Sequence, residues 1–337
     1  MSTTAQVSAS SQQQLPAPRY RKELLDRIVS DQIEWTEEDG KLVKCHFTSS
    51  DVGDFHNHKQ DIDAAKHVAA LDLHQARMQA ANASPSLTPA RDPRIHTAEE
   101  INALLAKHVD SKQGLLLDIG ASEVQRRNAN TYEKFDGYVP VNIGTDCVRR
   151  YAKKYNRMAL VANAEALPFP DASVDGVVTH AFLEHPGNPD AVLREIARVL
   201  KPGGIAVHND AWHCRWWQRF GLIGLKSFSK MTARERAIFM AAKLTESPAI
   251  RFPRITARRL MRELCSSTSR PIPLKRKQLR PNFSLNLGAD EHAVSSIDPM
   301  DVRRFYASRG FHETPRLRLP ERIFFRAAYI AVIKDDS

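Results

Sequence analysis

LPFPDASVDGVVTHAFLEHPGNPDAVLREIARVLKPGG, residues 167–204, is the stretch that determines how the rest of the chain is interpreted. It predicts a turn, a buried strand at Val174–Thr179, a helix, and a glycine turn that leads into a strand at Gly204–His208. Asn188 can cap the helix and Pro189 fits its first turn. The buried stripe of the helix is expected to be Leu193, Ile196, Ala197 and Leu200. Pro202-Gly203 is expected to end the helix. The stretch therefore predicts one repeat of an open α/β sheet.

Short apolar runs elsewhere continue this alternation of strands and helices. Strands are expected at Leu115–Gly120, Tyr138–Ile143 and Met158–Ala162, and a final one at Phe324–Ile333. The run from Leu115 is continuously apolar except at Asp118, which is typical of a strand that is covered on both faces. Strands that are separated by helices indicate a doubly wound, mostly parallel sheet.

The motifs in residues 163–204 resemble the central part of class I S-adenosylmethionine (SAM) dependent methyltransferases, in the type 11-like group that methylates small molecules. The resemblance covers about residues 97–210 and again about 299–334. It implies a seven-stranded Rossmann-like sheet with an antiparallel last strand, SAM as the cofactor, and methyl transfer as the reaction. The segment between these parts, 211–298, is expected to be an insertion on the substrate side.

The organisation of the chain follows from this register. Residues 1–18 are rich in Ser, Thr, Gln and Ala and are expected to be a disordered tail. A small N-terminal extension, 19–95, contains two β-like runs around Asp39-Gly40, which predict a hairpin, and ends in a Pro-rich linker. Residues 96–337 are expected to form the methyltransferase domain.

The turn after the first strand is the main candidate for the cofactor site. In the resembling family this turn reads acidic-x-Gly-x-Gly-x-Gly, and its glycines let the methionine part of SAM approach closely. Here Asp118 and Gly120 match the pattern, whereas Ser122 and Val124 replace the second and third glycines. The resemblance thus assigns Asp118, Gly120, Ala121 and Ser122 to cofactor binding.

The ends of the second, third and fourth strands supply the remaining expected cofactor contacts. Family members commonly hold the ribose with an acidic residue after the second strand, where this chain has Asn142 and Ile143, with Asp146 as an alternative. After the third strand, Asn163, Ala164 and Glu165 occupy the place near the adenine. The resemblance also assigns Thr179 and His180, which end the fourth strand, to the cofactor side.

Three histidines are the catalytic candidates. His180 lies in a segment that resembles the family loop beneath the cofactor, and His208 and His213 follow the fifth strand. A base that titrates near neutral pH would assist methylation of an oxygen, and histidine is suited to that task. A hydrogen-bonded structural role remains the alternative for each of them.

The insertion and the net charge of +10 bear on the acceptor. An aromatic stretch at 212–226 predicts a lid over an organic acceptor, a peripheral membrane contact, or a helix packed on the sheet. A basic run follows, which can bind a phosphate or carboxylate on the acceptor or form a solvated charged face. Its members are Arg251, Arg254, Arg258, Arg259, Arg262, Arg270, Lys275, Arg276, Lys277 and Arg280.

Two functional hypotheses remain open. The first is a SAM-dependent methyltransferase that acts on a small-molecule or lipid-linked acceptor, which the basic charge suggests is anionic. The second is a catalytically inactive methyltransferase-like domain that serves as a binding module, because two expected carboxylates are amides and two glycines are replaced. An NAD-dependent enzyme is disfavoured because the G-x-G-x-x-G turn is absent.

Composition limits the other classes. The four cysteines are far apart and form no C-x-x-C pair, so neither a metal site nor a disulfide framework is predicted. No secretory signal, membrane-spanning run or nucleic-acid motif is recognisable. We expect a cytoplasmic protein, with a peripheral membrane position as the alternative, and make no prediction of its oligomeric state.

Overall fold

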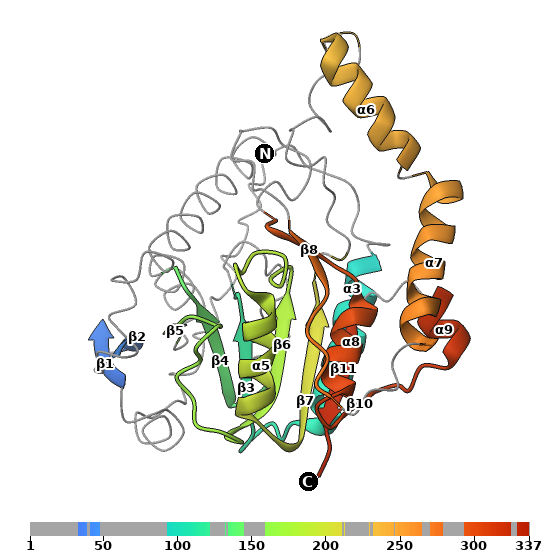
Figure 1. The fold of residues 1–337 in the computed structure, drawn as a ribbon. Coiled ribbons are helices and arrows are strands. Elements are labelled where there is room, and N and C mark those ends of the chain that lie inside the picture. Colours follow the sequence, from blue (N-terminus) through green and yellow to red (C-terminus); the bar gives the residue numbers. More distant parts are fainter. Residues whose placement is uncertain are drawn as a thin grey trace, which may run out of the picture.

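The computed structural model has a seven-stranded sheet at its centre (Figure 1). The structure describes residues 33–38, 41–47, 93–121, 132, 134–144, 159–210, 212, 229, 232–245, 247–264, 270–278, 293–324 and 329–336. The strands run in the order β10-β11-β7-β6-β3-β4-β5. They are β3 (Leu115–Ile119), β4 (Gly137–Asn142), β5 (Leu160–Val161), β6 (Val174–His180), β7 (Leu200–Asn209), β10 (Phe311–Glu313) and β11 (Ile330–Lys334).

The strand directions confirm the predicted fold class. β5, β4, β3, β6 and β7 pair in parallel, and β11 lies antiparallel to both β7 and β10. The continuously apolar run of β3 is buried along its whole length, as a strand covered on both faces requires. A doubly wound sheet with an antiparallel last strand is therefore present.

The predicted bounds of the third, fifth and final strands are wrong, and the fifth strand begins at Leu200 instead of Gly204. The third strand was expected at Met158–Ala162 but contains only Leu160 and Val161. The final strand was expected to begin at Phe324, which instead ends a short helix, α9 (Leu319–Phe324), with its ring half exposed. The apolar run is interrupted by Arg326, and only the part from Ile330 pairs with β7.

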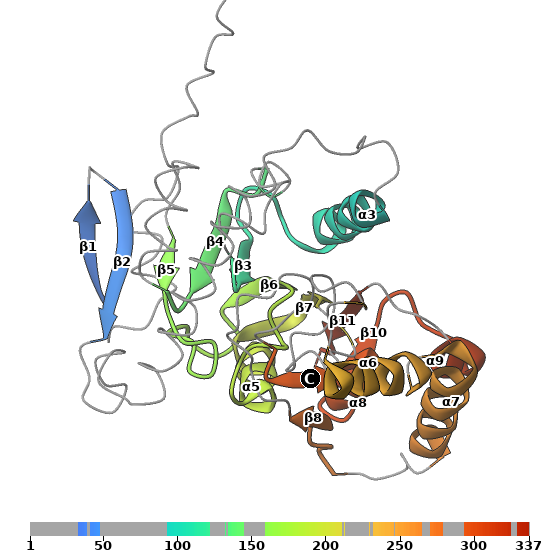
Figure 2. The same cartoon turned by 90° about the horizontal axis from the view of Figure 1, so that it is seen from above.

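Helices cover both faces of the sheet (Figure 2). α3 (Pro93–His108) packs one face with Ile101 and Leu105 against a cluster that includes Leu116 and Val178. α5 (Pro189–Val199) and α8 (Pro299–Ala307) cover the opposite face. The carboxyl ends of the parallel strands consequently form one open edge, which is where ligands bind in such sheets.

The helix predicted between the fourth and fifth strands is α5. The side chain of Asn188 accepts a hydrogen bond from the Ala191 N–H, and Pro189 occupies the first turn. The predicted helix end at Pro202-Gly203 is wrong, because α5 ends at Val199 and Leu200, which was expected in its buried stripe, already pairs with Val174 as the first residue of β7. Gly203 has a φ of 74°, which glycine adopts more easily than other residues. It lies just before Ile205, where the regular pairing of β7 with β6 begins.

Further elements lie outside the central sheet. α6 (Ala233–Thr245), α7 (Pro248–Leu264) and the antiparallel pair β8 (Arg276–Gln278) and β9 (Ser295–Ile297) lie between β7 and α8 in the chain. The predicted N-terminal hairpin is present as β1 (Ile33–Glu38) and β2 (Lys41–Phe47). No helix in the described part of the chain combines the length and apolar composition needed to cross a bilayer.

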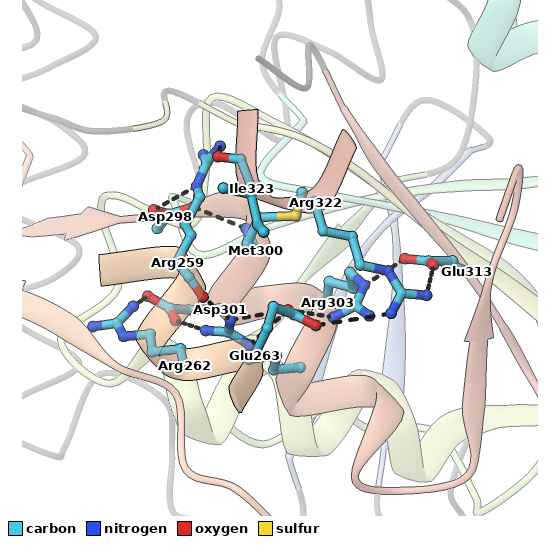
Figure 3. Close-up of polar contacts among 11 residues, drawn as sticks. Arg259, Arg262, Glu263, Asp298, Met300, Asp301, Arg303, Glu313, Arg322 and Ile323 are labelled. Carbon is cyan, nitrogen blue, oxygen red and sulfur yellow. Dashed lines mark hydrogen bonds and ion pairs between the residues drawn. The ribbon is translucent and has the colours of Figure 1, made fainter. Parts of the chain in front are cut away.

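A buried ion-pair network attaches α7 to the rest of the domain (Figure 3). Arg259 of α7 is 3% exposed, and its guanidinium lies 3.0 Å from Asp298, which also caps α8. Glu263 accepts from Arg304 of α8 at 2.9 Å. Further pairs join Arg258 to Asp298, Arg262 and Arg304 to Asp301, Arg303 to Glu263 and Glu313, and Arg322 to Glu263 and Glu313. The charges of α7 that face the protein are therefore neutralised by partners.

Removing one member of this network should destabilise the domain strongly. Asp298→Ala removes the carboxylate that neutralises the buried Arg259 and uncaps α8, so we expect a loss of roughly 3–5 kcal/mol in the free energy of unfolding. Arg194→Ala breaks an exposed pair with Asp190 and should cost less than about 1 kcal/mol. Urea unfolding followed by circular dichroism compares the two variants. Equal losses of unfolding free energy would show that the buried network contributes no more to stability than the exposed pair.

Candidate active site

The Gly120 turn lies at the carboxyl end of β3, directly beside the end of β6. Gly120 has a φ of 80°, a conformation that side chains other than glycine rarely adopt. A Cβ at this position would lie 2.4 Å from the ring of Phe182, in the loop after β6. The first glycine of the expected motif is therefore required both by the backbone and by the packing of Phe182.

Asp210 holds the loop that carries Phe182. Its Oδ1 accepts hydrogen bonds from the backbone N–H groups of Phe182 at 2.8 Å and Leu183 at 3.1 Å. Its Oδ2 accepts from the Thr179 hydroxyl at 2.8 Å. Between these contacts Ala181 has a φ of 46°, an unfavourable conformation for a residue with a Cβ. The carboxylate thus fixes a strained loop at the sheet edge.

His208 supports this carboxylate from inside the protein. Thr179 donates to Asp210, so its oxygen accepts from Nδ1–H of His208 at 2.9 Å. Nε2 then accepts from the Tyr306 hydroxyl at 3.0 Å, and the two rings stack. His208 is fully buried, and this desolvation lowers its pKa to about 3. Of the catalytic candidates, His208 therefore occupies a supporting position, out of reach of an acceptor.

Burial also acts on the groups around His208. It raises the pKa of Asp210, while the N–H groups of Phe182 and Leu183 oppose that shift. It raises the pKa of Tyr306 well above its ordinary value, so the phenol stays protonated and can donate to His208. The chain of donors from Tyr306 to Asp210 is complete while the imidazole is neutral.

His180 belongs to a second polar chain on the other face of the sheet. Its Nε2 lies 2.8 Å from the Tyr132 hydroxyl, and its Nδ1 lies 3.3 Å from Nδ2 of Asn209. Tyr132 stacks on Tyr138, whose hydroxyl donates to the buried Asp118 at 2.5 Å. His180 is partly exposed, unlike His208. It is therefore the described histidine candidate that can meet an acceptor.

Asn142 stabilises the glycine turn by both ends of its amide. Nδ2 donates to the backbone oxygen of Ala121 at 2.8 Å, and Oδ1 accepts from the Gly144 N–H at 2.9 Å. Gly120 N–H in turn donates to the backbone oxygen of Val141 at 2.8 Å. An amide serves here where a carboxylate would repel the Ala121 oxygen, which gives a physical reason for the Asn at this position.

The segment after β5 has a similar internal arrangement. Oδ1 of Asn163 accepts from the Glu165 N–H at 2.9 Å, and Oε1 of Glu165 accepts from the N–H of Asn188 at 2.9 Å. Ala164 is buried, and Asn163 and Glu165 are partly exposed. These contacts hold the turn that follows the third parallel strand at the same sheet edge as Gly120.

The structure brings together most of the residues that were expected at the site. Asp118, Gly120, Ala121, Asn142, Ile143 and the pair Thr179 and His180 end three adjacent strands. Ser122, His213 and Asp146 lie outside the described residues. Sequence reasoning missed Tyr132 and Asp210. Asp210 follows β7 directly, and that place at the carboxyl edge could have drawn attention to it.

The basic run of the insertion is used partly inside the protein. Arg258, Arg259 and Arg262 pair with Asp298 or Asp301, and Arg276 donates to Ser295 at 2.8 Å. These arginines hold elements together, which accounts for part of the charge that suggested an anionic acceptor. Most of the aromatic stretch 212–226 and Arg280 lie outside the described residues.

Comparisons with known proteins agree with this geometry. Residues 117–208 match a family model described as "Methyltransferase domain". A 64-residue segment is 41% identical to the ubiquinone/menaquinone biosynthesis C-methyltransferase UbiE of Pasteurella multocida, covering 19% of this chain and 24% of that protein. A 44-residue segment is 59% identical to the protein of the same name from Shewanella frigidimarina, covering 13% and 17%. The chain thus spans about a quarter or less of these relatives' length.

Two solved structures are similar at low identity. YcgJ from Bacillus subtilis is 13% identical with a TM-score of 0.40, covering 72% of this chain and 99% of that one. A SAM-dependent methyltransferase from Methanosarcina mazei is 15% identical with a TM-score of 0.39, covering 69% and 98%.

The matched segment contains β3, the Gly120 turn, β6 and most of β7. Residues 117–208 therefore match a methyltransferase domain, and the strand order agrees with the class I SAM-dependent type. SAM is the cofactor of this class of domain. The ring of Phe182 fills the side of Gly120 where a Cβ would lie, so the fit to the cofactor rests on the place of this positive-φ turn at the carboxyl edge of the sheet, between the ends of β4 and β6.

Adding a single methyl group at Gly120 should weaken cofactor binding. Gly120→Ala forces a Cβ against Phe182 in a backbone conformation that costs about 1 kcal/mol or more, so the turn must move. We expect at least a roughly tenfold weaker SAM dissociation constant by calorimetry. Gly310→Ala, also at positive φ but with no atom within 4 Å of the added Cβ, is the control and should leave SAM affinity unchanged.

The burial of neutral His208 predicts a pH dependence of stability. Its folded pKa of about 3 lies below the ordinary unfolded value near 6.5, so below about pH 6.5 the unfolded chain takes up a proton that the folded protein does not. The free energy of unfolding should therefore fall with decreasing pH, by up to about 1.4 kcal/mol per pH unit from this group.

His208→Gln should lower stability at neutral pH and flatten this dependence between pH 6.5 and 5. Urea unfolding at several pH values measures both slopes. Parallel slopes for the variant and the wild type would show that His208 is not the group responsible.

Proposed function

We propose that this protein transfers a methyl group from SAM to a small-molecule or lipid-linked acceptor. The observation that carries the proposal is the Gly120 turn, packed under Phe182 at the carboxyl edge of a methyltransferase-type sheet. SAM, when bound, supplies an electrophilic methyl group on a sulfonium. The protein's part in the reaction is then to position the acceptor and to manage its proton.

His180 and Tyr132 are proposed to take up the acceptor's proton. The step requires the tautomer in which Nε2 of His180 is unprotonated and accepts from the Tyr132 hydroxyl, with the Asn209 amide turned so that its oxygen accepts from Nδ1–H. The acceptor's proton then passes to the Tyr132 oxygen while the phenol proton passes to Nε2, which leaves a neutral phenol and an imidazolium. Asn209 orients the ring and acts as a positioning residue.

The acceptor class is proposed from two kinds of support. The two UbiE relatives carry names that refer to ubiquinone and menaquinone biosynthesis, which are lipid-linked rings. The net charge of +10 favours an acidic or phosphorylated acceptor, although several arginines of the insertion are paired internally. A lipid-linked aromatic ring with an ionisable hydroxyl satisfies both.

An inactive binding module is the second candidate. It is favoured by Asn142, whose amide is engaged with Ala121 and Gly144 where an acidic residue was expected for the ribose. Asn142→Asp is a poor test of this candidate, because a carboxylate would face the Ala121 oxygen and disturb the glycine turn. Binding of SAM together with failure to methylate any acceptor would favour the module.

The methyl-transfer proposal is tested with tritium-labelled SAM, a demethylated lipid quinol and a soluble phenol as acceptors. We expect His180→Gln to lower kcat by roughly 10²–10⁴-fold and Tyr132→Phe by less, with the SAM dissociation constant little changed. His312→Gln removes an exposed histidine that pairs with Asp335 at the opposite end of the strands and should have no effect. An unchanged kcat in His180→Gln would remove His180 from the mechanism.

A further inference from the structure

α7 has an inverted distribution of polar and apolar residues. Its protein-facing side carries Arg259 and Glu263, which are buried in the ion-pair network. Its outward side is apolar. We define the outer face of α7 by its exposed residues Ile250, Pro253, Ala257, Leu260, Met261 and Leu264. Their spacing of three and four residues places them on one side of a helix.

The exposed apolar area is concentrated around this face. Leu264 is 71% exposed and Met261 is 60% exposed. Among the described residues, the exposed large hydrophobic side chains all belong to α6, α7 or α9. Figures 1 and 2 show these three helices together on one side of the molecule. Large apolar patches on a protein surface mark a contact with a partner or a membrane.

Charge decides between the possible occupants. α6 and α7 together carry eight arginine and lysine residues and two glutamates, and three of the arginines, Arg258, Arg259 and Arg262, pair with Asp298 or Asp301. The other five are Arg234, Arg236, Lys243, Arg251 and Arg254, and Arg254 is exposed next to the outer face of α7. A second copy of the chain would bring two such cationic faces together, which is repulsive. An anionic lipid surface satisfies both the apolar face and its cationic border.

We propose that the outer face of α7, with the neighbouring apolar residues of α6 and α9, is a binding surface for anionic lipid bilayers. Leu260, Met261 and Leu264 enter the boundary between headgroups and acyl chains, and Arg254 contacts lipid phosphates. α6 extends past the carboxyl ends of β6 and β7, the edge that holds the Gly120 turn (Figure 1).

The inference rests on α7 itself and not on methyl transfer. It does bear on the proposed function, because a lipid-linked acceptor would be delivered from the same surface. The test below uses binding to vesicles and needs neither SAM nor an acceptor, so its failure and the failure of the proposed function are distinguishable.

The full-length protein should sediment with vesicles of phosphatidylcholine and phosphatidylglycerol, and at least about tenfold more weakly with phosphatidylcholine alone. Met261→Gln combined with Leu264→Gln should weaken binding by roughly tenfold or more, because two apolar side chains no longer leave water. Both positions are exposed, so circular dichroism and the Tm should be unchanged. Binding to neither vesicle, or equal binding by the double variant, would overturn the proposal.

A matched pair of charge variants tests the cationic border. Arg254→Gln should weaken binding to the anionic vesicles about fivefold, which is the contribution of one cation near an anionic surface. Lys112→Gln also removes an exposed cation, but outside α6, α7 and α9, and should have no effect. Equal effects would mean that net charge alone drives binding. If the wild type is a dimer in solution and the double apolar variant is a monomer, the outer face of α7 binds a second copy of the chain. That result would overturn the lipid-binding proposal.

Discussion

The carboxylate of Asp210 is the contact on which the candidate site depends. It accepts two backbone N–H groups and one hydroxyl at the carboxyl edge of the sheet, and so holds Ala181 in a strained conformation. That loop places Phe182 against Gly120 on one side and His180 beside Tyr132 on the other. A buried carboxylate with three donors is costly to disturb, which makes the geometry of the edge rigid.

Buried polar groups perform a second structural task between α7 and α8. Arg259 and Glu263 turn the charged side of α7 inward, where partners on α8 neutralise them. The consequence is that the apolar side of α7 faces outward, contrary to the usual arrangement of a surface helix. The same arginines that suggested an anionic ligand in the sequence therefore explain how an apolar surface is kept exposed.

Local signals predicted the fold well. The start of α5 at Asn188 and Pro189 and the buried strand β3 were predictable from the sequence. Both are signalled by residues that are adjacent in the chain. The site was predicted less completely. The buried position of His208 and the carboxylate of Asp210 depend on contacts between strands and with Tyr306, almost a hundred residues away. The spacing of residues in the sequence cannot predict such contacts. The start of the last strand was also mispredicted at Phe324, because it depends on where β11 pairs with β7.

Calorimetric titration of SAM and S-adenosylhomocysteine into the wild-type protein and into Asp210→Asn tests the account most directly. The amide keeps the size of the side chain but replaces one acceptor by a donor, so the loop should loosen. The account predicts binding to the wild type and a dissociation constant at least roughly tenfold weaker for the variant, with both proteins folded by circular dichroism. Failure of the well-folded wild type to bind either ligand, or equal affinities, would contradict it.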